Sequence, residues 1–304
     1  MKIITAGNKY LDIDAYASGI AYAVLLNGLG IESCFVSGAK LNKSIPEFVK
    51  NFEFEANTTY VPLEDDEFIL VDVSNPDFFD KIVDKNKIIE VIDHHTGFEE
   101  YWDKHECKNQ IEFIGSVATI IFEKFVQFKK TDLLSQNLCK LLICAILDNT
   151  LNLKGSITTK RDIDAFNKLM KIGKIHSSFV TEYFIACQHE IDENILTAIE
   201  NDIKMEFVNI DFPEVFGQIT IYDKDKVFDK LSSIAVLFEK FNKPWMINII
   251  CLKDGKSYIY TTNTTAQRQL ENLFKIQFNS NILKLESLML RKEILKYART
   301  KINL

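Results

Sequence analysis

The sequence is poor in the features that mark disordered, disulfide-bonded and membrane-spanning chains. Only 11 of its 304 residues are glycine and 5 are proline, while 47% are hydrophobic, so it is expected to fold around sizeable cores. The six cysteines lack C-x-x-C spacing and mostly lie in apolar runs, which indicates buried thiols of a reduced, cytoplasmic protein. No signal segment is evident and no apolar run approaches the roughly 18 residues that span a bilayer, so no membrane partner is expected.

Basic residues are fewer than acidic ones: the chain has 36 lysines and arginines against 43 aspartates and glutamates. The net charge of −7 argues against a nucleic-acid partner that is held mainly through phosphate contacts. If the substrate is itself an anion, its charge has to be neutralised locally, by metal ions or by a few well-placed lysines and arginines.

Histidine is scarce, and two of the five histidines are adjacent where a strand is expected to end. The apolar, β-branched residues 87–92 predict a buried strand, and Asp93-His94-His95 follows directly. Because neighbouring strand residues point to opposite faces, we expect one imidazole to bind a metal and the other to meet the substrate. Taken alone, the motif is equally consistent with a solvated turn.

The N-terminal residues predict a strand–loop–helix–strand unit, the building block of a parallel sheet. Residues 1–6 and 31–36 read as strands, and residues 15–28 have helical periodicity that ends at glycine. The intervening loop contains Asp12 and Asp14, near the strand end where such sheets bind ligands. These acids could also serve only as helix caps.

Further acids stand where apolar elements end: Asp72 in the strand expected over residues 68–73, and Asp148 after a helix that starts near residue 134. The resulting set of acidic and imidazole side chains is Asp12, Asp14, Asp72, His94 and Asp148. Its oxygen-rich chemistry suits Mn²⁺ or Mg²⁺, and zinc suits it less because no cysteine belongs to it. One small ion cannot use so many ligands, so two ions that share a bridging carboxylate are predicted.

Five motifs follow one another along the chain: Gly7-Asn8-x-x-x-Asp12-x-Asp14, Val71-Asp72, Asp93-His94-His95, Gly115-Ser116-x-Ala118-Thr119 and Leu147-Asp148-Asn149-Thr150-Leu151. In order and spacing they resemble the DHH phosphoesterase superfamily. More narrowly, the chain resembles the family II (manganese-dependent) inorganic pyrophosphatases and the related exopolyphosphatase and prune proteins. The resemblance covers essentially the whole chain and includes Lys204 and the pair Arg291-Lys292.

The resemblance implies an α/β fold in two domains. Residues 1–187 would form a DHH catalytic domain with a parallel sheet and helices on both faces. Residues 188–195 would be a linker, and residues 196–304 a smaller, substrate-clamping α/β domain with a mixed sheet.

It also implies residue roles. The metal ligands would be Asn8, Asp12, Asp14, Asp72, His94 and Asp148, holding two divalent ions (Mn²⁺ or Mg²⁺, with Co²⁺ as a further candidate), and Asp72 would bridge them. His95 would contact the departing phosphate, while Lys204, Arg291 and Lys292 would clamp the far phosphate. The implied reaction is hydrolysis of inorganic pyrophosphate or short polyphosphate to orthophosphate by a metal-bridged hydroxide.

The chain departs from the pyrophosphatase pattern at three places: Asn8 replaces a metal-binding histidine, Val73-Ser74 replaces His-Asn, and Leu290 replaces a serine. These losses leave a non-catalytic phosphate-binding homologue as one alternative. A DHH phosphodiesterase acting on nucleotides is another, although such enzymes usually carry a Gly-Gly-Gly-His motif and this chain has no two adjacent glycines. The sequence leaves a homodimer open.

We predict that Asn8→His tightens Mn²⁺ binding, because an imidazole is a stronger ligand for this ion than an uncharged amide oxygen. Isothermal titration of the apoprotein with Mn²⁺ and Mg²⁺ would measure the change. Equal Mn²⁺ affinities for the variant and the parent protein would contradict the prediction.

Overall fold

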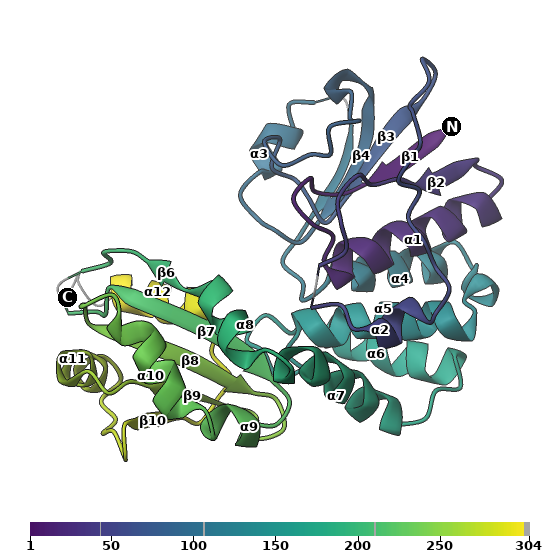
Figure 1. The fold of residues 1–304 in the computed structure, drawn as a ribbon. Helices are drawn as coiled ribbons and strands as arrows, with labels where there is room; N and C mark the ends of the chain where they lie inside the picture. The colour runs from purple at the N-terminus through teal and green to yellow at the C-terminus, as the bar shows by residue number, and fades with distance from the viewer. Residues whose placement is uncertain (43, 106, 210, 301–304) are drawn as a thin grey trace. The chain divides into compact units, whose positions relative to one another are not determined.

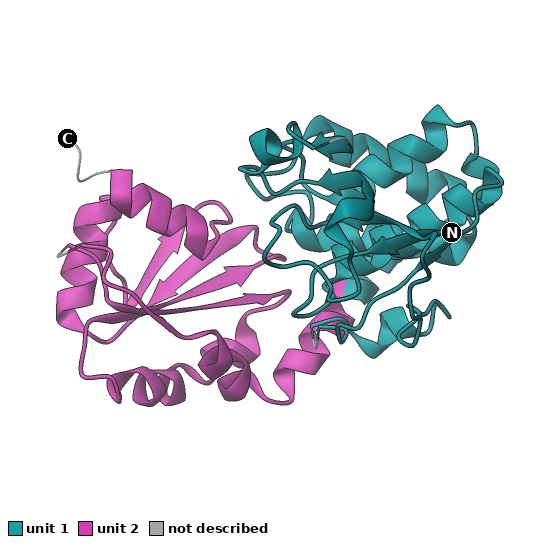
Figure 2. Cartoon of the chain, turned by 90° about the horizontal axis from the view of Figure 1, so that it is seen from above, with its two compact units in different colours: residues 1–183 teal, residues 184–304 magenta. Residues whose placement is uncertain are grey.

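The computed structural model describes residues 1–300 except 43, 106 and 210, and the chain divides into two compact units, residues 1–183 and 184–304 (Figures 1 and 2). Each unit contains one five-stranded sheet, parallel in the first and mixed in the second, which confirms the predicted α/β class. In the described part of the chain, no helix has the length and apolar character needed to cross a lipid bilayer.

The sheet of the first unit has the strand order β2-β1-β3-β4-β5, and every neighbouring pair is parallel. Its strands are β1 (Lys2–Thr5), β2 (Ser33–Phe35), β3 (Glu67–Val71), β4 (Ile88–Asp93) and β5 (Lys108–Ile111). The chain leaves β1 towards β2 on one side and then returns to β3 on the other. Between β1 and β3 the order therefore reverses, and in open parallel sheets ligands bind outside the carboxyl ends of strands at such a point.

The two faces of this sheet are covered differently. Long helices cover one face: α1 and α4 pack on the strands, and α5 packs against both helices (Figure 1). On the other face, Trp102 of a short helix joins Ile3, Leu70 and Val91 in a buried cluster. The α-helices of this unit are α1 (Ile13–Gly28), α2 (Glu47–Lys50), α3 (Glu99–Trp102), α4 (Val117–Gln127), α5 (Gln136–Asn149) and α6 (Lys160–Ile172).

The second unit has the strand order β10-β9-β8-β7-β6, in which only β7 and β8 are parallel to each other. Its strands are β6 (Lys204–Met205), β7 (Val215–Ile221), β8 (Trp245–Cys251), β9 (Lys256–Tyr260) and β10 (Ile282–Leu285). Its helices are α8 (Ile195–Asp202), α9 (Asp225–Phe228), α10 (Leu231–Glu239), α11 (Thr264–Phe274) and α12 (Arg291–Thr300). The predicted linker, residues 188–195, contains the end of α7 (Ser178–Asp192) and the first residue of α8.

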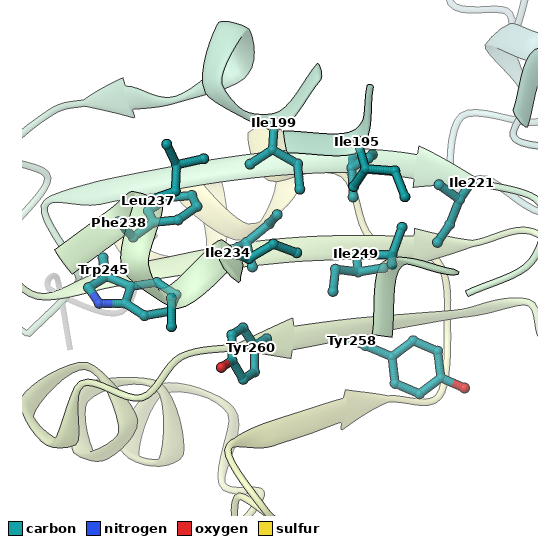
Figure 3. Packing of buried hydrophobic residues seen from close by; sticks show 14 of the residues in the cluster. Ile195, Ile199, Ile221, Ile234, Leu237, Phe238, Trp245, Ile249, Tyr258 and Tyr260 are labelled. Atoms are coloured by element: carbon teal, nitrogen blue, oxygen red, sulfur yellow. The ribbon is translucent and has the colours of Figure 1, made fainter. Parts of the chain in front are cut away.

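Both faces of this second sheet are buried, which explains why all seven residues of β8 are inaccessible. Figure 3 shows one face, where Ile199 of α8 and Phe238 of α10 lie over the sheet; Phe238 stacks on Trp245 with ring centroids 4.9 Å apart. On the opposite face, Met246 packs in a cluster with residues of α11 and α12. The apolar run in β8 is therefore the signature of a central strand.

A buried ion pair ties the first sheet to its helices. Lys124 of α4 donates to Glu90 of β4 at 3.1 Å, and the hydroxyl of Tyr22 in α1 donates to the other carboxylate oxygen at 2.5 Å. The side chains of Glu90 and Lys124 are only 9% and 8% exposed, so water screens this pair little.

We predict that Lys124→Met lowers the free energy of unfolding of the first unit by about 3 kcal/mol, because it removes the buried cation and leaves Glu90 only the exposed Lys108, whose Nζ is 3.7 Å away. Scanning calorimetry and urea unfolding would measure the loss. The double variant Glu90→Gln/Lys124→Met should recover part of it, and Lys168→Met, at an exposed site, should change little. An unchanged stability for Lys124→Met would show that the pair contributes nothing.

Candidate functional site

A cavity of about 410 Å³ opens at the carboxyl end of the first sheet, where the strand order reverses. Segments that follow β1, β3 and β4 form its wall: Gly7, Asn8, Lys9, Tyr10, Asp72, Val73, Ser74, Asn75, Phe78, Asp93, His95 and Phe98. Asn8 is an exposed residue and forms part of this wall. The cavity therefore combines acids and an imidazole with polar and aromatic side chains.

Asp72 is the most unusual residue of the cavity. It follows β3 with φ of 56°, a left-handed conformation that non-glycine residues seldom adopt and that is concentrated at functional sites. Its side chain is 3% exposed, and its Oδ1 atom has no hydrogen-bond partner among the described residues. Burial, followed by the charges of Asp12, Asp14 and Asp93, raises the pKa of Asp72 well above its usual value. A cation beside Oδ1 would stabilise the buried negative charge of Asp72 and offset its repulsion from the neighbouring carboxylates.

His94 is oriented to face that oxygen. Its Nδ1 lies 3.1 Å from the carbonyl oxygen of Ile114, a contact that fixes the ring and leaves Nε2 on the other side. Nε2 lies 3.4 Å from Oδ1 of Asp72. Metal-binding histidines characteristically use their second nitrogen in this way, so His94 and Asp72 fit a shared cation.

His95 has a different environment, because 64% of its side chain is exposed. Its Nδ1 lies 2.9 Å from Oδ1 of Asp93, and this hydrogen bond raises the pKa of His95. Burial tends to raise the pKa of Asp93, but the hydrogen bond and charge of His95 outweigh it and lower that pKa. Asp93 also accepts from the backbone N–H groups of both histidines, at 2.7 and 3.1 Å.

The expectation that the adjacent histidines point to opposite faces was wrong. Their ring centroids are 4.4 Å apart, and Nε2 of His94 and Nδ1 of His95 lie within 3.4 and 3.7 Å of the same Asp72 oxygen. The reason is that β4 ends at Asp93, so the strict alternation of a strand no longer applies to the next two residues.

Asp12 and Asp14 belong to the first turn of α1. Asp12 caps the helix by accepting from the backbone N–H of Ala15 at 2.9 Å through Oδ1, which does not decide whether it also binds a metal. Asp14 is fully buried, and burial raises its pKa although His94 partly opposes the shift. Its two oxygens accept five hydrogen bonds, from the side chains of Ser18, Ser116 and Asn149 and the backbone N–H groups of Val117 and Ala118.

Asp148 is near the end of α5 and accepts from the hydroxyl of Tyr183 at 3.3 Å. The side chain reaches solvent, yet desolvation by the surrounding protein, followed by the charge of Asp12, raises the pKa of Asp148 to about 6. Three consecutive left-handed residues then turn the chain: Leu151, Asn152 and Leu153, with φ between 49° and 59°.

Asp12 and Asp14 thus lie close enough to both Asp72 and Asp148 to raise their pKa values, and this mutual repulsion fits divalent cations. Asp72, His94 and His95 each offer one ligand atom within 4.8 Å of the others. Asp14 fits less directly, because protein donors already occupy both of its oxygens. Sequence reasoning missed the orienting role of Asp93, although Asp93 is part of the motif that contains both histidines.

The predicted cationic residues belong to the second unit. Lys204 is exposed on β6, and Arg291 and Lys292 begin α12. Arg291 forms a two-pronged ion pair with Asp202, through Nη1 to Oδ2 at 2.5 Å and Nη2 to Oδ1 at 3.2 Å. Sequence reasoning missed this partner, which is 89 positions away and forms no local pattern with Arg291.

Comparisons with known proteins agree with this geometry. Residues 2–146 match the DHH family, N-terminal domain. A "Probable manganese-dependent inorganic pyrophosphatase" of Oceanobacillus iheyensis is 28% identical over 251 residues, which is 80% of this chain and 78% of the relative. A protein of the same description from Lactobacillus acidophilus is 24% identical over 297 residues and 94% of both chains.

Two solved structures share the fold over nearly the whole chain. A Methanococcus jannaschii protein described as a "putative family II inorganic pyrophosphatase" has a TM-score of 0.62 at 22% identity, with full coverage of both chains. An exopolyphosphatase-related protein from Bacteroides fragilis has a TM-score of 0.51 at 13% identity, covering 99% of this chain and 91% of that one. Residues 2–146 therefore form a DHH-family N-terminal domain, and the whole chain resembles the manganese-dependent family II pyrophosphatases.

Proposed function

We propose that this protein is a divalent-metal-dependent phosphoanhydride hydrolase that cleaves inorganic pyrophosphate, or short inorganic polyphosphate, to orthophosphate. The observation that carries the proposal is the buried, unpaired Oδ1 of Asp72 beside Nε2 of His94, in the middle of several carboxylates. The names of the relatives favour pyrophosphate as the substrate.

The residues that would hold two divalent ions, Mn²⁺ or Mg²⁺, are Asn8, Asp12, Asp14, Asp72, His94 and Asp148. Such ions, when bound, neutralise phosphate oxygens and make water a stronger nucleophile at neutral pH. The protein contributes orientation: the carbonyl of Ile114 holds the His94 ring, and the left-handed backbone directs the carboxylate of Asp72. Because these groups are held by buried neighbours, little reorganisation is needed when substrate arrives.

His95 is proposed to assist the departing phosphate. Asp93 holds Nδ1 and favours the protonated imidazole, so Nε2 can donate a hydrogen bond or a proton to a leaving-group oxygen. Its exposure on the cavity wall suits a residue that must reach the substrate.

Lys204, Arg291 and Lys292 are proposed to bind the phosphate that does not react. A chain of net charge −7 needs local cations to hold a multiply charged anion. Arginine can grip two phosphate oxygens with its planar fork, whereas each lysine acts as a single compact charge.

The proposal is tested by phosphate release from pyrophosphate, tripolyphosphate and a dinucleotide, each with Mg²⁺, Mn²⁺ and Co²⁺. Release from pyrophosphate or tripolyphosphate, at rates well above release from the dinucleotide, is expected. Preferential cleavage of the dinucleotide would indicate a phosphodiesterase. No release from any compound, with metal binding shown by calorimetry, would indicate a non-catalytic phosphate-binding protein.

We predict that Asp72→Ala abolishes turnover, lowering kcat by roughly a thousandfold or more, and weakens divalent metal binding in a calorimetric titration. Asp72→Asn keeps the size and tolerates the left-handed backbone, so it separates loss of charge from loss of fold. His105→Ala, at an exposed site outside the cavity, is the matched control. Full activity of Asp72→Ala would rule out the proposed centre.

We also predict that Arg291→Ala raises KM for pyrophosphate about tenfold or more while metal affinity changes little, because the guanidinium binds phosphate and not the cations. Steady-state kinetics and metal titration would measure the two effects. Arg268→Ala, at an exposed position on α11, should leave both unchanged. A loss of metal affinity that equals the loss of substrate affinity would contradict this assignment.

A further inference from the structure

Asp202 is the last residue of α8, and it meets Arg291 with both its side chain and its main chain. The carboxylate accepts from Nη1 at 2.5 Å and from Nη2 at 3.2 Å. The carbonyl oxygen of Asp202 accepts a further hydrogen bond from Nη1 at 3.0 Å. The guanidinium therefore lies directly against the C-terminal end of a helix.

This placement explains an otherwise unfavourable residue. The C-terminal end of a helix carries partial negative charge, so an acid there destabilises the helix unless a cation is near. Arg291 supplies that cation, and its side chain is only 14% exposed. The presence of Asp202 is thus better explained by its hydrogen bonds to Arg291 than by any stabilisation of α8.

Two more hydrogen bonds close the arrangement. The backbone N–H of Gln218 in β7 donates to Oδ2 of Asp202 at 2.8 Å, and the side chain of Gln218 accepts from the backbone N–H of Arg291 at 2.5 Å. Met289 is anchored as well, because the buried Asn248 donates to its carbonyl at 2.7 Å. The start of α12 and the carboxylate of Asp202 are consequently held to the same sheet.

The donor count shows which part of Arg291 stays available. A guanidinium has five N–H donors, and Asp202 takes three of them: both hydrogens of Nη1 and the inner hydrogen of Nη2. The two that remain, Nε–H and the outer hydrogen of Nη2, are parallel on the adjacent edge of the plane. Neither has a partner within residues 1–300, leaving aside positions 43, 106 and 210. Parallel donors of this kind match two oxygens of one phosphate.

We propose that Asp202 is a positioning residue for phosphate binding. It accepts hydrogen bonds from Nη1 and Nη2 of Arg291 and so orients the Nε–Nη2 edge of the guanidinium towards the substrate. This inference rests on the proposed function, in which Arg291 binds the phosphate that does not react. It assigns a role to an acid that a charge argument alone would place among the residues that repel the substrate.

Asp202→Ala should raise KM for pyrophosphate about tenfold, with kcat changed less than threefold, because the arginine loses its orientation and not its charge. Asp202→Glu, which restores a carboxylate, should recover part of the loss. Asp202→Ala/Arg291→Ala should be no worse than Arg291→Ala, since the acid acts through the arginine. Thermal unfolding of each variant shows whether the fold is retained.

The matched control is Glu206→Ala. Glu206 also pairs with an arginine of α12, Arg299, but both partners are exposed, so KM should not change. A readout that needs no turnover is the side-chain Nε–H NMR signal of Arg291, identified by its loss in Arg291→Lys among only four arginines. Adding methylenediphosphonate, a non-hydrolysable analogue of pyrophosphate, with Mg²⁺ should shift this signal in the parent protein, and Asp202→Ala should need about ten times more of the analogue for the same shift.

The possible failures are distinguishable. If Arg291→Ala raises KM but Asp202→Ala leaves it unchanged or lowers it, Asp202 does not position the arginine, and the proposed hydrolase stands. If Arg291→Ala has the parent KM and the Arg291 signal of the parent protein does not respond to the pyrophosphate analogue, the phosphate-binding role of Arg291 fails and the role of Asp202 fails with it. If pyrophosphate neither binds nor reacts in the parent protein, the proposed function is wrong.

Discussion

The buried carboxylate of Asp14 is the interaction on which the layout of the first unit depends. It accepts hydrogen bonds from three helices at once: from Ser18 in α1, from the N-terminus of α4 and from Asn149 in α5. A negative charge at the start of α4 is also favoured by the helix dipole. Each of these helix ends carries or adjoins a residue of the proposed metal site, so the carboxylate helps to fix their positions relative to one another.

The hydrogen bonds to Asp14 hold three parts of the proposed site in place. The N-terminus of α1 carries Asp12, and the segment before α4 contains the carbonyl of Ile114, which orients His94. The C-terminal end of α5 carries Asp148. The strand ends add Asp72 and Asp93 to this group. Burial is the largest cause that raises the pKa of Asp72 well above its usual value, and the charges of the neighbouring acids raise it further. A divalent cation is the simplest compensation for such crowding.

The acidic residues that stand at the ends of strands or helices could be predicted from the sequence. Asp72 follows the apolar strand β3, and parallel strands bring such ends to one edge of a sheet. Asp148 follows the apolar run within α5. The mixed sheet of the second unit was also expected, and β8 and β9 are indeed antiparallel while β7 and β8 are parallel. In contrast, the strand at 282–285 and the helix at 264–274 were not predicted, although both complete the second unit.

What could not be predicted depends on side-chain orientation and on contacts between distant residues. The two histidines share one oxygen only because β4 stops one residue before them, and strand ends are poorly defined by pattern. Asp202 and Arg291 are 89 residues apart, and nothing in either local sequence points to the other. The five donors to Asp14 likewise come from elements that meet only in the folded chain.

The left-handed backbone at Asp72 restricts how this protein can change during evolution. Few residues accept φ of 56° without strain, chiefly glycine, asparagine and aspartate, and only aspartate among them carries a charged oxygen ligand. A lengthened acid such as glutamate can adopt this backbone, as Glu53 does with φ of 64°, but its carboxylate would stand one methylene further from the main chain than that of Asp72. A lineage that gave up the proposed metal chemistry should therefore drift at this position towards glycine or asparagine, so the residue found there would record whether selection for the proposed metal site has persisted.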